Sequence, residues 1–422
     1  MRIFISAGEP SGDLHAANLI RSLRRLFPDA QFDAFGGEKM AAAGANLRYP
    51  LVNLAVMWFV SVLANIVTFI RLIFKADRYF RDEKPDAVVL VDYPGLHWWI
   101  AGRAKARGIP VFYFVPPQIW AWAGWRVNKV RKYIDLVLCS LPFEPEWYRA
   151  RGVSNAIHVG HPYFDELRDR PLDQAFLKEQ GTPTSSLVAI LPGSRTREVT
   201  RNLPEMVRAA AELAKKRPDV RFGVACLHEQ HKALAEQIIT QTLAGVDARH
   251  VPEIEVFAGR TPELIRLARV AWAVSGSVGL ELMFEALPSV VLYKMKRFDL
   301  WVARPFIKAK FISLVNLLAN KEVFPEYLTW RDVAGELTRW ALSWLDDTEA
   351  RSRTTGALLE LRALVAKPGA SDRAADHIAA WLAANRPPVL GFDDTTSRKT
   401  YRGPHDSAAG AIQTDHPLSE RS

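Results

Sequence analysis

Short apolar runs alternate with longer helical stretches along most of this chain, and this alternation limits the possible folds more than any other feature of the sequence. Most of the runs are apolar throughout, as expected for strands that are buried on both faces of a parallel sheet. Helical stretches such as 203–217 lie between them, so the pattern is that of doubly wound α/β domains. The predicted strands are 2–7, 87–92, 111–115, 136–139, 188–191, 221–226, 270–275 and 289–294.

Two sets of these units are separated by a polar, proline-containing stretch at 165–186, which we interpret as the linker region between two Rossmann-like domains. A length of 422 residues fits two domains of ordinary size. After about Arg386 the chain has little apolar content, which is typical of disorder. The predicted parts are an N-terminal domain, a C-terminal domain, a C-terminal helix and a disordered tail, at 1–165, 186–365, 366–385 and 386–422.

Composition excludes several classes of protein. The two cysteines, Cys139 and Cys226, are too few for a disulfide scaffold or a cysteine-rich metal site, and they fit a reducing compartment. The N-terminus runs from a short apolar stretch straight into a Gly-containing turn, unlike a signal peptide, so we expect a cytoplasmic protein. A net charge of +9 favours anionic partners, namely phosphates or an anionic membrane surface. Nucleic acid is not expected, because no zinc-finger spacing or RRM-type signature is present.

The first Gly-containing loop, in 6–20, follows a predicted strand and precedes a predicted helix. Ser11 or Asp13 could cap that helix, whose N-terminal amides would then face the ligand-binding edge of the sheet. An ordinary tight turn is the alternative, since the loop is neither a GxGxxG fingerprint nor a Walker A loop. We include Ser11 and Asp13 among the candidate substrate-binding residues.

A second loop, at 191–198, has the same layout in the C-terminal half of the chain. Gly193 allows a sharp turn, after which Ser194 and Arg195 stand where a helix N-terminus and a guanidinium can hold a diphosphate together. The alternative is a plain helix cap with an ion pair between Arg195 and Glu198.

A third loop closes a strand with Ser275, Gly276 and Ser277, and Glu281 falls about one turn into the following helix. A carboxylate at that place can accept hydrogen bonds from both hydroxyls of a ribose. The alternative is a first-turn glutamate that only complements the helix dipole. One turn suited to a diphosphate and one suited to a ribose together predict a sugar nucleotide.

The segment 49–70 contains no charged residue, and its length approaches that of a membrane span. Three interpretations stay open: a buried core helix, a helix that dips into one leaflet, and a true span. Docking is favoured by the basic residues and aromatics that follow, whereas a span would divide a Rossmann sheet. The candidate docking residues are Trp58, Phe59 and Phe69.

Taken together, these segments resemble the lipid-A-disaccharide synthase family, glycosyltransferases of the GT-B fold. The resemblance covers about residues 1–385. It rests on seven ordered motifs: 8–20, 35–47, 115–148, 158–167, 190–199, 275–295 and 311–326.

The resemblance implies an α/β fold of two Rossmann-like, doubly wound domains that face each other across a cleft. It also implies an inverting transfer of diacylglucosamine from UDP-2,3-diacylglucosamine to 2,3-diacylglucosamine 1-phosphate, with no metal and no cofactor. Such an enzyme would be peripheral on the cytoplasmic face of the inner membrane, where the apolar 55–70 segment would dock. A homodimer stays open.

The resemblance also assigns roles to residues. Gly193, Ser194 and Arg195 would hold the UDP diphosphate, and Arg195 would offset the charge on the leaving group. Glu281 would bind the ribose, and the 275–277 turn would line the phosphate site. Asn316 matches a polar residue that the family keeps at the donor site.

The chain departs from the family pattern on the acceptor side. The family reads D-x-P-D-F-N after the third strand, and its second acidic residue is taken as the general base; here that position is Gly95. Near Met57, Ser61 stands where the family has glutamate. Asp92 and His97 are the nearest replacement bases. Two rivals follow: an enzyme of the same fold with another acceptor or an epimerase reaction, and a non-catalytic, membrane-docked binder of UDP-sugars.

Overall fold

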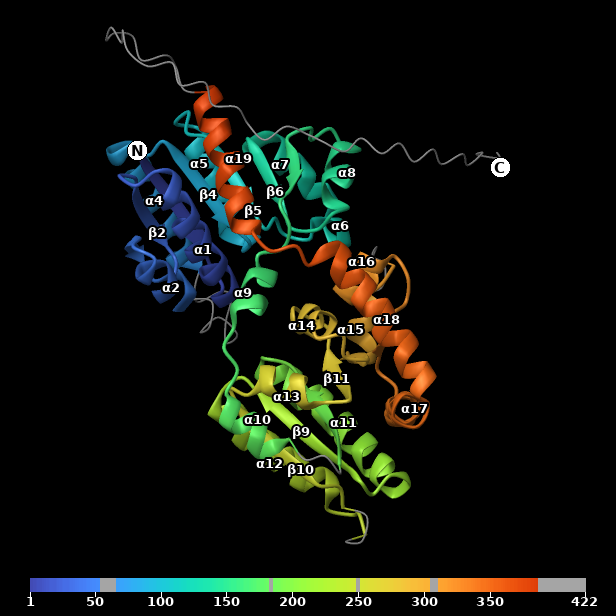
Figure 1. Cartoon of the computed structure of the whole chain (residues 1–422). Helices are drawn as coiled ribbons and strands as arrows, with labels where there is room; N and C mark the ends of the chain where they lie inside the picture. Colours follow the sequence, from blue (N-terminus) through green and yellow to red (C-terminus); the bar gives the residue numbers. More distant parts are fainter. Residues whose placement is uncertain (54–65, 182–184, 248–250, 304–309, 386–422) are drawn as a thin grey trace, which may run out of the picture. The chain divides into compact units, whose positions relative to one another are not determined.

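The computed structural model describes residues 1–53, 66–181, 185–247, 251–303 and 310–385. It contains two parallel sheets, each with helices interleaved between its strands (Figure 1). The strands of the first sheet fall within residues 2–158 and those of the second within 186–329. The predicted class, α/β with two doubly wound sheets, is therefore confirmed.

The first sheet has the strand order β3-β2-β1-β4-β5-β6-β7. Its strands are β1 (Arg2–Ala7), β2 (Gln31–Phe35), β3 (Asn46–Tyr49), β4 (Ala87–Val91), β5 (Val111–Phe114), β6 (Leu136–Cys139) and β7 (Ala156–His158). The helices among them are α1 (Pro10–Leu26), α2 (Glu38–Ala42), α4 (Ile66–Glu83), α5 (Pro94–Lys105), α6 (Ile119–Trp122), the 3-10 turn η1 (Gly124–Arg126), α7 (Val127–Tyr133) and α8 (Glu144–Arg149).

The second sheet has the strand order β10-β9-β8-β11-β12-β13. Its strands are β8 (Ser186–Leu191), β9 (Val220–Cys226), β10 (Ile254–Ala258), β11 (Val270–Val274), β12 (Ser289–Lys294) and β13 (Glu326–Thr329). The remaining helices are α9 (Tyr163–Asp169), α10 (Gln174–Gln180), α11 (Thr196–Lys216), α12 (Glu229–Leu243), α13 (Thr261–Leu267), α14 (Val278–Phe284), α15 (Arg297–Ala303), α16 (Leu314–Ala319), α17 (Ala334–Asp346), α18 (Thr348–Val365) and α19 (Ala370–Asn385).

All eight predicted strands are present within two residues of their expected bounds. The five strands without a prediction, β2, β3, β7, β10 and β13, are short and carry polar residues. The predicted linker region contains α10 and most of α9. The predicted disordered tail, 386–422, lies outside the described residues.

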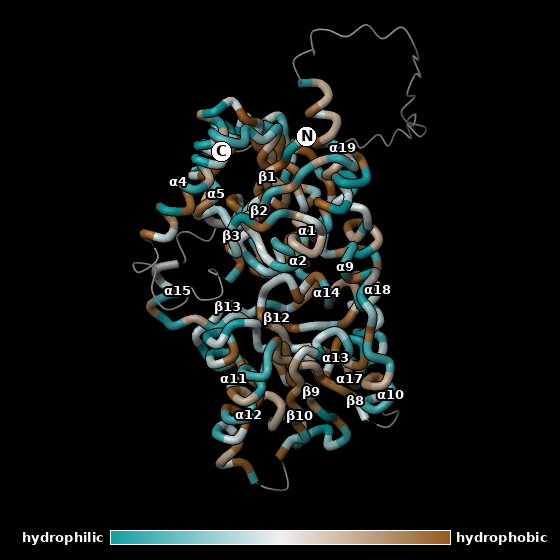
Figure 2. The backbone as a smooth tube through the Cα atoms, turned by 90° about the vertical axis from the view of Figure 1, so that its left-hand side faces the viewer, coloured by the Kyte–Doolittle hydropathy of each residue, from teal (hydrophilic) through white to brown (hydrophobic). Residues whose placement is uncertain are grey.

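Each sheet has one point where the strand order reverses, between β1 and β4 in the first sheet and between β8 and β11 in the second. Ligands bind in this fold beside the carboxyl ends of the strands at such a point. The central strands are buried and apolar, and they appear as brown stretches of tube around β1, β8 and β9 in Figure 2. The polar residues near the two reversal points therefore lie in the loops that follow these strands. The candidate residues are therefore sought in the loops after β1, β4, β8 and β11.

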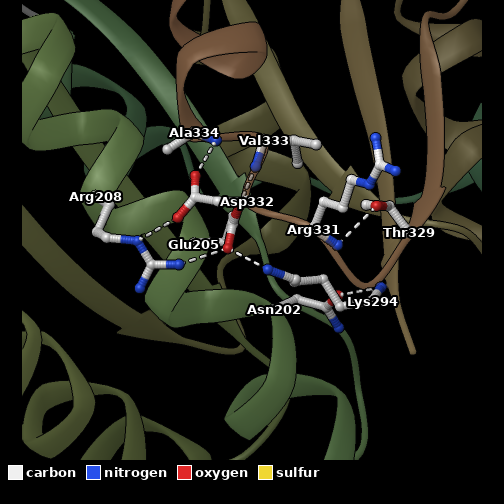
Figure 3. A network of polar contacts seen from close by, with 9 residues as sticks. All are labelled: Asn202, Glu205, Arg208, Lys294, Thr329, Arg331, Asp332, Val333 and Ala334. Carbon is white, nitrogen blue, oxygen red and sulfur yellow. Dashed lines mark hydrogen bonds and ion pairs between the residues drawn. The ribbon is translucent and has the colours of Figure 1, made fainter. Parts of the chain in front are cut away.

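A buried polar network holds α11 against the carboxyl end of β12 (Figure 3). Glu205 is fully buried and accepts hydrogen bonds from the Arg208 side chain (2.5 Å), the Lys294 ammonium and the Val333 amide. The Asn202 side chain accepts from the Lys294 amide at 3.0 Å. One carboxylate thus joins the helix that starts at the predicted diphosphate turn to two further segments of the second half.

We expect Glu205→Gln to lower the free energy of unfolding by about 3 kcal/mol, because removing one partner of a buried ion pair leaves an uncompensated charge. Glu349→Gln is the matched control: that carboxylate is 82% exposed and pairs with Arg353, so its loss should change the free energy of unfolding by less than about 1 kcal/mol. Chemical denaturation of both variants measures the difference. Equal, small losses would show that the network does not stabilise the protein.

Candidate active site

A cavity of about 520 Å³ lies at the carboxyl ends of β8 and β11, where the strand order of the second sheet reverses. It brings together the predicted residues of two loops that are about 80 positions apart in the sequence. The predicted residues that line it are Gly193, Ser194, Arg195, Ser275, Gly276, Ser277 and Glu281. The side chains of Tyr163, Glu166, Arg170 and Glu198 line it as well.

The predicted diphosphate turn is a tight loop between β8 and α11. Gly193 has a φ of +115°, and a Cβ there would lie 2.5 Å from the Cβ of Glu198, so the turn requires glycine. The Glu198 carboxylate accepts from the Ser194 amide at 3.0 Å and the Arg195 amide at 3.3 Å. The Arg195 guanidinium lies 3.4 Å from the same carboxylate, and its side chain is 52% exposed. The capped-helix alternative is thus present, and the cap uses the amides that a phosphate would need.

The second turn leaves space beside the first. Ser275 donates its hydroxyl hydrogen to the Ile312 carbonyl at 2.7 Å, which anchors the start of the turn. Gly276 and Ser277 are exposed, and among the described residues, chain neighbours aside, no atom lies within 4 Å of a Cβ placed on Gly276. This turn therefore offers backbone and hydroxyl groups to the cavity without closing it.

Glu281 is 5% exposed and is held by two residues that the sequence did not suggest. Its carboxylate accepts from the Arg170 guanidinium at 2.7 Å and from the Tyr163 hydroxyl at 3.0 Å. Burial raises the pKa of Glu281, while the charge of Arg170 acts to lower it. A buried glutamate needs a cation or a hydrogen-bond donor nearby. This requirement could have indicated that Glu281 has such partners, although not which residues they are. The carboxylate is therefore fixed in direction at the cavity wall.

At the first sheet, Asp92 directly follows β4 and has an uncommon backbone conformation. Asp92 and Tyr93 have φ values of +51° and +49°, in the left-handed region that non-glycine residues seldom adopt. The Asp92 carbonyl accepts from the His97 ring at 2.6 Å and from the Tyr113 hydroxyl at 2.9 Å, which holds this conformation. Burial, followed by the negative charge of Glu9, raises the pKa of the Asp92 carboxyl to about 6. A carboxylate with that pKa is suited to act as a general base near neutral pH.

His97 lies beneath this loop and is fully buried. Its Nδ1 donates to the Asp92 carbonyl, and its Nε2 accepts from the Ser6 hydroxyl at 2.9 Å. Burial lowers the pKa of His97 to about 4, so the ring is neutral at pH 7. Both ring nitrogens are occupied within the protein, which suits a residue that positions Asp92.

The first Gly-containing loop differs from its expectation. Neither Ser11 nor Asp13 caps α1: the helix begins at Pro10, and Glu9 is its N-cap residue. Asp13 is buried, and its carboxylate accepts from the backbone amides of Gly37, Lys39 and Met40 at 2.9 to 3.2 Å, so it caps α2. Ser11 is exposed on the first turn of α1. The capping prediction failed because the partner of Asp13 lies more than twenty residues further along the chain.

Asn316 does not line the cavity. Its side chain is fully buried and donates to the Phe324 carbonyl (2.7 Å) and the Glu326 carboxylate (2.9 Å). Its Oδ1 accepts from the amides of Val323 and Phe324 at 2.8 and 2.9 Å. The residue therefore fixes the loop between α16 and β13, and its predicted donor contact stays a prediction.

Comparisons with known proteins identify the group to which this arrangement belongs. The family model described as lipid-A-disaccharide synthetase matches residues 3–361. The chain belongs to this family. A curated lipid-A-disaccharide synthase from Myxococcus xanthus is 34% identical over 390 residues, which cover 91% of this chain and 98% of that protein.

Solved structures share the fold at much lower sequence identity. A UDP-GlcNAc 2-epimerase from Neisseria meningitidis, solved with UDP-GlcNAc bound, has a TM-score of 0.60 at 14% identity and covers 91% of this chain and 100% of its own. MurG from Acinetobacter baumannii has a TM-score of 0.54 at 16% identity, with coverages of 90% and 99%. These likenesses are ones of fold, and they agree with the predicted GT-B class.

The position at which the family resemblance led us to expect an acidic residue is occupied by Gly95. Gly95 is the second residue of α5 and is exposed. Apart from its chain neighbours and the backbone of its own helix, no atom of the described residues lies within 4 Å of a Cβ placed on it. A Cβ therefore fits at this position without displacing a described neighbour.

The predicted docking segment is described only in part. Trp58 and Phe59 lie outside the described residues, and Phe69 is partly buried against the core of the first sheet. Val67, Ile70 and Phe74 are 51%, 47% and 61% exposed and recur at helical spacing on α4. Within the residues that the structure describes, no helix combines the length and the apolar content that crossing a bilayer requires.

Proposed function

We propose that this chain is a lipid-A-disaccharide synthase. It transfers 2,3-diacylglucosamine from UDP to 2,3-diacylglucosamine 1-phosphate, and the products are the disaccharide 1-phosphate and UDP. The observation that carries the proposal is the cavity at the β8/β11 reversal, which gathers a diphosphate turn, a second polar turn and a buried carboxylate in a chain of this family.

The donor is held in that cavity. Ser194 and Arg195 bind the diphosphate at the start of α11, and Glu281 accepts from the ribose hydroxyls. As the bond from the sugar C1 to the phosphate oxygen breaks, negative charge grows on UDP. The Arg195 guanidinium and the helix N-terminus offset that charge, so no metal is needed for the departure.

The acceptor is activated from the first sheet. Its 6-hydroxyl attacks C1 from the face opposite UDP, which inverts the configuration and forms the β-1′,6 bond. Asp92 takes the proton of this hydroxyl, supported by its raised pKa and by the contacts that fix its backbone.

Release of UDP from UDP-2,3-diacylglucosamine, measured with and without the lipid 1-phosphate acceptor, tests the proposal. We expect release only with the acceptor, together with a disaccharide product. Conversion of the donor without acceptor would indicate an epimerase, and release with a different acceptor would indicate another transferase. Tight UDP binding without turnover would indicate a non-catalytic binder, the rival that Gly95 favours.

The enzyme works as a peripheral protein on the cytoplasmic face of the inner membrane, because both of its substrates carry acyl chains. The uncharged 49–70 segment and the exposed face of α4 support this placement. That the enzyme forms a homodimer stays a prediction.

We expect the combined substitution of Trp58, Phe59 and Phe69 by Ser to move the protein from the membrane fraction to the soluble fraction. Ile70→Ser with Phe74→Ser should have the same effect, and it replaces only exposed side chains. The reason is the loss of apolar area that the bilayer would bury. Fractionation measures the shift. Protection of one end of the segment from protease in sealed vesicles would contradict docking and indicate a span.

Gly95→Asp restores the family's acidic residue at a place with free space. If the acceptor side is impaired by Gly95, the transfer rate should rise, and if Asp92 already serves, the rate should change little. In both cases we expect a gain of roughly 0.5–1 kcal/mol in the free energy of unfolding, because a helical glycine is removed and an acid is placed in the first turn. Lower stability would contradict the open geometry.

A further inference from the structure

Two large aromatic side chains stand exposed on α15, in the second half of the chain. Phe298 is 70% exposed and Trp301 is 74% exposed, and their ring centroids are 6.1 Å apart. Residues three apart on a helix lie on the same face, so the two rings form one apolar surface. Single exposed apolar residues are common, but two adjacent aromatic rings with this exposure call for an explanation.

The same helix turns its acidic residue the other way. The Asp299 carboxylate lies 3.8 Å from the Arg197 guanidinium and 3.7 Å from that of Arg201, both on α11. The charge of Asp299 is therefore offset by α11. The aromatic face of α15 is left without a carboxylate of its own helix.

Basic groups accompany the aromatic face. Lys296 and Arg297 are exposed at the start of α15. The Arg297 guanidinium lies over the Trp330 ring at 5.2 Å, and the Arg331 guanidinium lies over the same ring at 5.5 Å. Trp330 is itself 43% exposed, so it adds a third ring that is flanked by two cations. We call Phe298, Trp301, Trp330 and the three basic residues the α15 patch.

The chemistry of the α15 patch matches an anionic bilayer. Trp and Phe rings are stable at the boundary between head groups and acyl chains, where Lys and Arg beside them meet lipid phosphates. The cations add attraction that depends on anionic lipid and on salt. A protein partner of neutral surface would leave the cations without a counter-charge.

We propose that the α15 patch is a membrane-contact surface, separate from the 49–70 segment and α4, and that it seats on anionic lipid. The inference rests on the proposed function, since acylated substrates are what bring this enzyme to a bilayer. It adds a lipid contact to the half of the chain that holds the donor cavity.

A label at position 301 tests the contact directly. Trp301→Cys can carry a fluorophore selectively, because Cys139 and Cys226 are buried. Leu364→Cys is the matched control, since Leu364 is 71% exposed on α18 and outside the α15 patch. With the full chain on vesicles of phosphatidylglycerol and phosphatidylcholine that bear brominated acyl chains, we expect the label at 301 to be quenched about twofold or more and the label at 364 to be unaffected.

A second measurement does not depend on labelling. Phe298→Ser with Trp301→Ser should weaken binding to the anionic vesicles by about tenfold or more, because the apolar burial of two aromatic rings is lost. Leu364→Ser should leave vesicle binding unchanged. UDP binding by the double variant should equal that of the wild type, which shows that the fold is intact.

Several outcomes would overturn the inference. The first is that the full chain does not bind the vesicles, and the second is that the labels at 301 and 364 are quenched equally. The third is that the label at 301 becomes shielded from solvent at high protein concentration without vesicles, which would indicate a contact between copies of the chain. Acceptor-dependent UDP release alongside any of these would leave the proposed function standing. Quenching at 301 without turnover would instead reject the function and retain the lipid contact.

Discussion

Replacing Asp92 by Asn should slow transfer by about a hundredfold to ten-thousandfold, the usual contribution of a general base. The asparagine keeps the size of the side chain and the backbone carbonyl that His97 and Tyr113 contact. It cannot take the proton of the acceptor hydroxyl. Steady-state transfer with both lipid substrates measures the loss, and unchanged UDP binding shows that the donor side is intact.

The same variant has a signature in the pH profile. A base must be ionised, and the pKa of Asp92 is raised to about 6, so kcat/KM of the wild type should rise with pH up to about 6 and level off above it. This rise should disappear in Asp92→Asn.

His97→Gln is the companion to this test. Glutamine retains a donor for the Asp92 carbonyl, so we expect a much smaller loss of rate than for Asp92→Asn, with the rise of the pH profile preserved. If both variants transfer at the normal rate, neither residue is the base, and the acceptor side of the mechanism has to be rebuilt.

Replacing Arg195 by Ala should lower turnover by on the order of a hundredfold or more, since a charge-assisted contact to a leaving diphosphate contributes roughly 3 kcal/mol. The loss should fall on kcat more than on the KM for the donor, because the negative charge on UDP grows as the bond breaks. The side chain is half exposed, so the fold should persist.

Arg197→Ala is the matched control, because Arg197 lies two residues further on, in the first turn of α11, with a side chain that is 68% exposed and 3.8 Å from the Asp299 carboxylate. We expect it to retain most of the activity. Turnover of Arg195→Ala within about threefold of wild type would remove Arg195 from the chemistry.

The apolar strands were predictable because burial on both faces leaves a continuous signal in the sequence. β13, with the sequence EYLT, is half-buried, so its residues carry no such signal. The two turns that line the cavity beside β8 and β11 were also predictable, since each is local: a glycine or serine after a strand and a polar residue at a helix start. Parallel strand order then brings them together without further information.

Partners that are distant in sequence could not be predicted. Glu281 is held by Arg170, 111 residues earlier, and nothing near either residue indicates the pair. Asp13 was proposed as a ligand-binding residue on local grounds, yet its carboxylate is bonded to backbone amides more than twenty residues further along the chain. Asn316 was proposed from the family resemblance, and its side chain is bonded to backbone amides of the loop that follows its own helix. A buried polar residue in a loop motif can thus form hydrogen bonds with the backbone as readily as with a substrate.

The carboxylate of Glu198 means that the turn proposed to bind the diphosphate already holds an anion of its own. The amides of Ser194 and Arg195 are both bonded to it. A phosphate that binds these amides therefore has to replace the Glu198 carboxylate. The free energy of donor binding is then the difference between the attraction of the amides for the phosphate and their attraction for that carboxylate. Dissolved salt screens both alike, so donor binding should respond less to ionic strength than binding in a vacant basic pocket would. The Glu198 carboxylate also caps the start of α11, so this helix end is stabilised without a bound nucleotide.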